Sequence, residues 1–203
     1  MSYAISLVYI TRRSNTEDAW LQTLINNLDD RFELIVVGHT NIINSRFIYI
    51  PFWDDGLDEL GLISSKKNLG VAISSAKYCL VIHADVYPRI DFVDEATKNL
   101  PLPNEHICPV GFYDSDPTIR GLTWCQNMEP RSQPPDRPDD SDMYIGGAAI
   151  FSTKLTLMTY PWDNKLRHGQ GIGEDLELSI RARANNVKLS CNPNLVVYMY
   201  NNQ

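Results

Sequence analysis

Short runs of residues that are apolar at almost every position constrain this chain more than any other feature. The runs span Ala4–Ile10, Phe32–Val37 and Tyr78–Ile82. A strand has this character when helices cover both faces of its sheet, whereas a strand with one wet face alternates apolar and polar residues. The chain is therefore predicted to be an α/β protein with a mostly parallel central sheet flanked by helices.

Two segments with helical spacing lie between these strands. In the first, Thr16 fits an N-cap, two acids follow it, and apolar residues recur at helical spacing over 20–28. The second is predicted over Ser64–Ser75, and a further short strand over Phe47–Ile50. The predicted inward residues of the second helix are Leu69, Ala72, Ile73 and Ala76.

The second half of the chain is less regular. A proline-rich and acid-rich stretch, 129–142, has no apolar periodicity and is predicted to be a loop. The stretch is an insertion within one domain and not a linker between two domains, so a single domain is expected over 1–203. The other predicted elements are strands at Ile107–Phe112, Tyr144–Phe151, Val187–Leu189 and Leu195–Tyr200, and a helix from Glu174 to about Asn185.

The charge balance bears on the partner class. The formal net charge is −7 and the pI is about 5.0. A nucleic-acid binder normally presents a basic surface, so nucleic acid is not the expected partner. The first residues lack the pattern of a signal peptide, and no apolar run approaches the roughly 18 residues of a transmembrane segment. A cytoplasmic protein with reduced cysteines is the expectation.

Polar residues follow three of the predicted strands. In open parallel sheets, ligands bind at the carboxyl ends of the strands, and Thr11, Gly38 and Asp85 fall there. Mg²⁺ and Mn²⁺ prefer oxygen ligands, so one carboxylate together with a substrate diphosphate is enough to hold either ion. Asp85 is therefore a candidate metal ligand. The alternative is that it caps the turn that follows.

Three further segments combine glycine or lysine with possible chemistry. Gly173-Glu174-Asp175 opens a helix, where a carboxylate could accept a proton from a hydroxyl or could simply favour the helix dipole. Gly146-Gly147 interrupts an apolar run, which indicates a close backbone approach or a packing role. Lys66-Lys67 could reach a phosphate or could lie on a solvated helix face.

Four of these pieces, in this order, resemble the family 2 glycosyltransferases of the glycosyltransferase A-type (GT-A) fold. Lys67-Asn68-Leu69-Gly70 is similar to the family's R-N-x-G, and the strand that ends at His83-Ala84-Asp85 is similar to its D-x-D element. Gly146-Gly147 looks like its G-G segment, and Glu174-Asp175 like its E-D element. The resemblance extends from Ile5 to about Val197.

The resemblance implies transfer of a sugar from a nucleotide-diphosphate sugar to a hydroxyl acceptor, metal-dependent and inverting. It divides the domain into a nucleotide-binding half, about 1–100, and an acceptor and catalytic half, about 101–203. Asp175 would be the general base, Asp85 would bind Mn²⁺ or Mg²⁺, and Glu174 would contact donor or acceptor hydroxyls. The implied donor-binding residues are Thr11, Arg12, Gly38, Lys67, His83, Asp85, Gly146 and Gly147. Trp124, with Trp162 as a further candidate, would contact the acceptor carbohydrate or glycoconjugate; the alternative is that these are core tryptophans.

Three positions depart from the family pattern. Gly38-His39-Thr40-Asn41 stands where D-D-x-S usually recognises uracil, so a UDP-sugar is only the default expectation. His83 replaces the first acid of D-x-D. No histidine follows Asp175, and His168 is the substitute metal ligand that the sequence offers.

Two other functions stay open at this level. A nucleotidyltransferase can share such a sheet, but the loop after its first strand is normally rich in glycine, and here it has two arginines and no glycine. A non-catalytic nucleotide-sugar-binding homologue would account for the altered Gly38-His39 and His83 positions.

Overall fold

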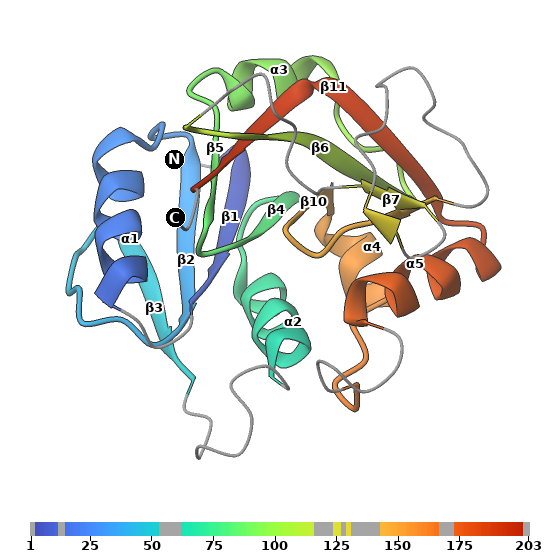
Figure 1. The fold of residues 1–203 in the computed structure, drawn as a ribbon, viewed down its shortest axis with the longest axis horizontal. Coiled ribbons are helices and arrows are strands. Elements are labelled where there is room, and N and C mark those ends of the chain that lie inside the picture. The colour runs from blue at the N-terminus through green and yellow to red at the C-terminus, as the bar shows by residue number, and fades with distance from the viewer. Residues whose placement is uncertain are drawn as a thin grey trace.

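A mixed sheet of eight strands forms the centre of the molecule (Figure 1). The computed structural model describes residues 3–11, 15–52, 62–115, 124–126, 129–130, 143–166 and 173–200. Within them the strand order is β3-β2-β1-β4-β10-β6-β11-β5. The strands are β1 (Ile5–Ile10), β2 (Phe32–Gly38), β3 (Phe47–Pro51), β4 (Tyr78–His83), β5 (Val86–Pro88), β6 (Glu105–Tyr113), β10 (Ala149–Thr153) and β11 (Lys188–Met199).

Most of the pairings in the sheet are parallel, as predicted. β1 pairs in parallel with both β2 and β4, β2 with β3, and β6 with β11. β10 is antiparallel to β4 and β6, and β5 is antiparallel to β11. The register places Ile10 beside Val37 on one side and His83 on the other, so that three strands end together.

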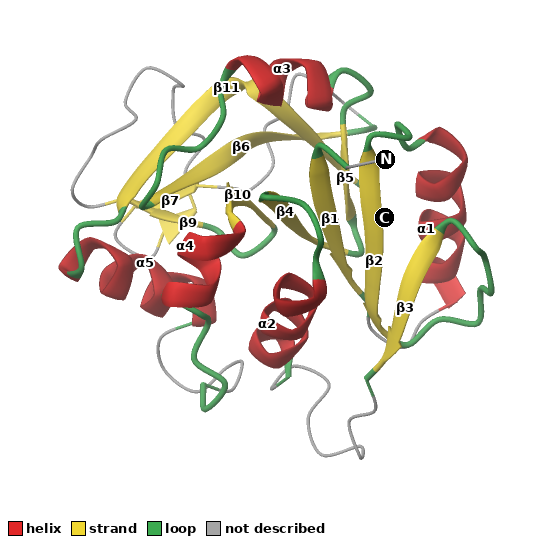
Figure 2. Cartoon of the chain, turned by 180° about the vertical axis from the view of Figure 1, so that it is seen from behind, coloured by secondary structure: helices red, strands yellow, loops and turns green. Residues whose placement is uncertain are grey.

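Helices cover both faces of the sheet (Figure 2). On one face, α1 (Asn15–Asn27) and α3 (Phe92–Lys98) contribute to a core that includes Leu7 and Tyr9 of β1. On the other face, α2 (Ile63–Ile73), α4 (Lys154–Thr159) and α5 (Glu174–Ala184) pack with Val8 and Ile10. Consecutive residues of β1 are therefore buried on opposite sides, which explains why the run is apolar throughout. None of the described helices is long and apolar enough to span a membrane.

A small second sheet joins three short strands, β8 (Glu129–Pro130), β7 (Trp124–Gln126) and β9 (Met143–Ile145), in that order. β8 lies inside the stretch that was predicted to be a loop, and most of that stretch lies outside the described residues. The two late strands predicted separately form one strand, β11, whose pairing with β6 shifts register between Asn192 and Val196. β5, α3 and α4 have no counterpart among the predicted elements, because each is too short to show a periodic pattern.

The inward face predicted for α2 is wrong at Ala72 and Ile73, whereas Leu69 is half-buried and Ala76 is buried. Ala72 is exposed and Ile73 is 39% exposed, whereas Lys66 and Lys67 are buried. The helix turns its lysine-bearing side inward because that side faces polar groups at the strand ends and at the start of α5. Apolar periodicity cannot identify such a face, since the partners of the lysines come from distant parts of the chain.

Candidate functional site

Thr11, Gly38 and the His83–Asp85 segment meet at the carboxyl ends of β1, β2 and β4, as the strand pattern predicts. Gly38 has φ +134°, and a Cβ atom there would lie 2.4 Å from the backbone oxygen of Thr11. Only glycine fits this conformation and this close approach. The Thr11 amide continues the ladder by donating to the Val37 carbonyl at 3.0 Å.

A small pocket opens at these strand ends. Its volume is about 60 Å³, which suits a small polar group and is well below the several hundred cubic ångströms of a whole nucleotide site. The residues that line it are Ile10, Thr11, Glu17, Trp20, Ile63, Lys66, His83, Ala84 and Asp85. The pocket therefore brings together three of the predicted donor-binding residues.

Buried groups hold the walls of this pocket in place. The Lys66 ammonium donates to the Thr11 carbonyl at 3.0 Å, and the Tyr9 hydroxyl donates to the Ala84 carbonyl at 2.6 Å. Burial is the main cause that raises the pKa of Tyr9 above its usual value, so the hydroxyl keeps its proton. The turn that carries Asp85 is thus fixed from the core. Tyr9 was missed in the sequence because it looks like an ordinary strand residue.

A second cluster joins α2, the turn before β10 and the start of α5. Lys67 Nζ lies 3.1 Å from Glu174 Oε1 and 3.1 Å from the Gly147 carbonyl oxygen. The Gly147 amide donates to Asp175 Oδ2 at 2.8 Å. The Lys67 side chain is 0% exposed and that of Glu174 is 11% exposed. Four of the predicted site residues are therefore in mutual contact, and Gly146 is buried beside them.

Gly147 is placed where a side chain would collide with this cluster. A Cβ atom there would lie 3.0 Å from Glu174 Oε1 and 3.3 Å from Lys67 Nζ. The close backbone approach that the Gly146-Gly147 pair indicated is thus an approach to the charged groups of α2 and α5.

Glu174 stays ionised despite its burial. Burial by itself raises the pKa of the carboxyl, but the Lys67 ammonium, with a smaller contribution from His83, holds the pKa below its usual range. The influence of His83 links this cluster to the small pocket at the strand ends. Lys67 therefore acts on Glu174 and Gly147 in this structure, rather than lying on a solvated helix face.

Trp162 is part of the wall behind Lys67. The residue is 3% exposed, and Lys67 Nζ lies 5.3 Å from its ring centroid. Asn68 fixes its backbone through two hydrogen bonds, to the Trp162 carbonyl at 2.8 Å and from the Trp162 amide at 3.0 Å. A tryptophan buried in this way is not a stacking platform for an acceptor sugar, so of the two interpretations of Trp162 the core tryptophan is confirmed.

Some predicted site residues cannot be compared. Arg12 and His168 lie outside the described residues, and only the backbone of Trp124, in β7, is described. Within the described part of the chain, no group of three or more His, Cys, Asp or Glu side chains could hold a metal ion by itself. Asp85 supplies one hard oxygen ligand at the pocket, which fits Mg²⁺ or Mn²⁺ where substrate phosphates complete the coordination.

Comparison with known proteins identifies the fold and no more. No protein-family model and no curated protein matches the sequence. The crystal structure of S. aureus TarS 1–349 matches with a TM-score of 0.64 at 10% identity, over 97% of this chain and 60% of that chain. In all, 410 chains of known structure match, so the likeness leaves the substrate open. The chain has a mostly parallel α/β fold similar to that of TarS 1–349.

Proposed function

We propose that this protein is a family 2-like glycosyltransferase of the GT-A fold, which moves a sugar from a nucleotide-diphosphate sugar to a hydroxyl acceptor. The observation that supports this most is the cluster of Lys67, Gly147, Glu174 and Asp175 beside the pocket that holds Asp85. A transfer reaction needs one group that holds the donor diphosphate and one carboxylate near the acceptor. Asp85 in the pocket would take the first role, and Asp175 in the cluster would take the second.

Asp85 would hold Mn²⁺ or Mg²⁺ on the donor diphosphate. The metal, when bound, would neutralise charge on the leaving group. Because no described cluster of side chains could bind the ion alone, we expect the nucleotide and the metal to bind together. Thr11 and His83 line the same pocket and would contact the donor.

Asp175 would serve as the general base in a single displacement that inverts the anomeric carbon. Its Oδ2 atom accepts the Gly147 amide at 2.8 Å, which orients the carboxylate on the glycine turn. Glu174 is ionised and held by Lys67, so it is placed to accept hydrogen bonds from sugar hydroxyls. General-base assistance is typically worth about 10² to 10⁴ in rate.

The donor site is tested by calorimetric titration with UDP, GDP and CDP, each with and without Mn²⁺. We expect one nucleotide to bind only in the presence of the metal, and Asp85→Ala to abolish that binding. Asp30→Ala is the matched control, because Asp30 is an exposed acid remote from the pocket. If a folded protein binds none of the three nucleotides, or if Asp85→Ala binds as the wild type does, the donor site is wrongly assigned.

One observation favours a second candidate, a nucleotide-sugar-binding protein without turnover. Asp175 Oδ1 accepts the Leu176 amide at 2.9 Å while Oδ2 accepts Gly147, so both oxygens already have backbone donors. A carboxylate engaged in this way could be purely structural. Incubation with the nucleotide sugar that binds, with chromatography of the products, separates the candidates: release of free nucleotide above the protein-free rate excludes the second.

A further inference from the structure

A larger cavity lies outside both the pocket of Asp85 and the cluster of Lys67, Gly147, Glu174 and Asp175. It is on the face of the sheet that α1 and α3 cover. Its volume is about 630 Å³, within the range of small-molecule sites. We name it the tyrosine groove and define it by six of its lining residues: Asn27, Tyr87, Arg89, Asp114, Tyr198 and Tyr200. They come from the end of α1, from β5 and the residue after it, and from the ends of β6 and β11.

Three tyrosine rings form one connected wall of the groove. The ring centroids of Tyr87 and Tyr198 are 5.5 Å apart, and those of Tyr87 and Tyr200 are 4.8 Å apart. Burial raises the pKa of Tyr200 to about 12, and burial together with Asp114 raises the pKa of Tyr87. The phenols of Tyr87 and Tyr200 therefore keep their protons at neutral pH, and the Tyr87 hydroxyl can donate a hydrogen bond beside an apolar ring surface.

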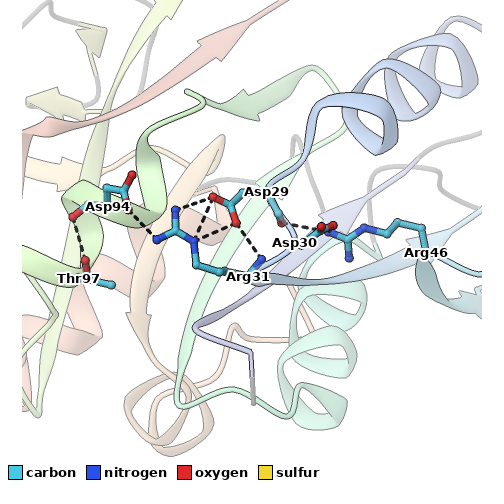
Figure 3. A network of polar contacts seen from close by, with 6 residues as sticks. All are labelled: Asp29, Asp30, Arg31, Arg46, Asp94 and Thr97. Atoms are coloured by element: carbon cyan, nitrogen blue, oxygen red, sulfur yellow. Dashed lines mark hydrogen bonds and ion pairs between the residues drawn. The ribbon is translucent and has the colours of Figure 1, made fainter. Parts of the chain in front are cut away.

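The charges of the groove are unsuited to an anion. The Arg89 guanidinium is engaged by Asp91, with Nη2 to Oδ2 at 2.9 Å. Asp29, which also lines the cavity, is held by Arg31, and Arg31 in turn reaches Asp94 of α3 at 2.6 Å (Figure 3). Asp114 adds a second carboxylate to the lining. A phosphate or a sugar acid would meet these carboxylates, whereas an uncharged polyol would find acceptors for its hydroxyls.

We propose that the tyrosine groove is a carbohydrate-binding site that takes one or two uncharged pyranose rings. Aromatic rings match the apolar C–H surfaces of a pyranose, and the planar amide of Asn27 and carboxylate of Asp114 match its neighbouring hydroxyl groups. The volume of about 630 Å³ is enough for a disaccharide. This site is independent of the transfer chemistry proposed above.

A stacked pair of rings separates the groove from the pocket of Asp85. Trp20, which lines that pocket, stacks on Tyr200 at 4.9 Å with an interplanar angle of 2°. The Tyr200 amide also donates to the Asp85 carbonyl at 2.8 Å. A glycan held in the groove would therefore lie one ring pair away from the pocket without entering it, and each site can be removed by mutation on its own.

Saturation-transfer NMR and calorimetry on the whole chain test this site, with cellobiose, maltose, lactose and N,N′-diacetylchitobiose as probes. We expect at least one disaccharide to bind saturably, and Tyr198→Ala and Asn27→Ala each to weaken that binding at least tenfold. Asn27 is exposed at the end of α1, so its variant should fold normally. Tyr3→Ala, which changes an exposed tyrosine outside the groove lining, should bind as the wild type does.

Failure of the proposed sugar site can be distinguished from failure of the proposed donor site. Asp85→Ala should keep sugar binding, and Asn27→Ala should keep nucleotide binding. The proposal is overturned if none of the four disaccharides binds the wild type, if both groove variants bind within twofold of the wild type, or if Tyr3→Ala weakens binding as much as Tyr198→Ala does.

Discussion

Two ionic networks in this molecule each join segments that are far apart in the sequence, yet they differ in what surrounds them. Lys67 and Glu174 connect α2 to α5 with side chains that are 0% and 11% exposed. Arg31 connects the turn before β2 to Asp94 of α3 with side chains that are 46% and 56% exposed (Figure 3). The charges and the distances are similar, so burial is the main difference.

Burial therefore distinguishes the Lys67–Glu174 pair from the Arg31–Asp94 pair, which is a surface contact. Exposed ion pairs are screened by water and salt and contribute little to folding. A buried pair costs desolvation energy, which only good geometry and additional hydrogen bonds offset. Lys67 has both, since it also donates to the Gly147 carbonyl. Lys67 thereby holds the Glu174 carboxylate ionised at the start of α5.

The largest effect is expected for Asp175→Asn, which tests whether the buried network serves chemistry or only structure. If Asp175 is the base, the transfer rate should fall by about 10² to 10⁴ while the free energy of unfolding changes by about 1 kcal/mol or less. Asp30→Asn is the control for loss of one carboxylate at an exposed position. An unchanged rate in Asp175→Asn would remove it from the mechanism.

Lys67→Met should produce the largest loss of stability. It leaves the Glu174 carboxylate buried without its partner, and breaking a buried pair costs about 3–5 kcal/mol. Urea denaturation measures the loss, and the double variant Lys67→Met/Glu174→Gln should recover part of it because no isolated charge remains. Lys98→Met, at an exposed pair with Glu95, is the control and should be unchanged within error. If Lys67→Met and Lys98→Met lowered the free energy of unfolding by similarly small amounts, burial would not distinguish the two kinds of ion pair.

A buried titratable group without an ionic partner extends the comparison to pH. His106 Nδ1 contacts Ser152 Oγ at 2.9 Å, and burial lowers the pKa of His106 from 6.5 to about 4. The unfolded chain then binds more protons between these values, so stability is full above pH 6.5 and falls as the pH drops toward 4. This group accounts for a loss of roughly 3 kcal/mol over that window.

His106→Gln should therefore flatten the fall in stability between pH 6.5 and 4, whatever it does to stability at pH 7. Denaturant unfolding at several pH values measures the slope. His39→Gln, at a half-buried histidine outside the core, serves as the matched control. Parallel slopes for the wild type and His106→Gln would show that another group sets the acid sensitivity.

Arg31→Gln should have the smallest effect. The urea midpoint should shift several times less than in Lys67→Met, and the shift should shrink as salt is added, because the pairs are exposed. A shift as large as that of Lys67→Met would mean that exposure does not distinguish the two networks.

Local sequence pattern predicted the long buried strands and placed Asp85 at a strand end and Glu174 and Asp175 at a helix start, but it missed the short strand β5. Tertiary contacts decided the rest. Runs such as Phe32–Val37 identify buried parallel strands because both of their faces are covered. The same reasoning misplaced the face of α2, since Lys66 and Lys67 are buried by partners that no local window contains. The tyrosine groove cannot be predicted from the sequence for a similar reason. Its residues come from separate elements, and no local sequence pattern marks any of them as part of a site.

The central position of β10 has a consequence for how this protein is made. β4 ends at His83, but its partner on one side, β10, starts only at Ala149, and the parallel partner of β6, β11, starts at Lys188. As a nascent chain leaves the ribosome, β4 thus keeps an open apolar edge until the middle of the sheet has been translated. The unpaired backbone groups of such an edge strand favour pairing with other chains. The nascent chain is therefore expected to be most open to such pairing after β4 has been translated and before β10 has.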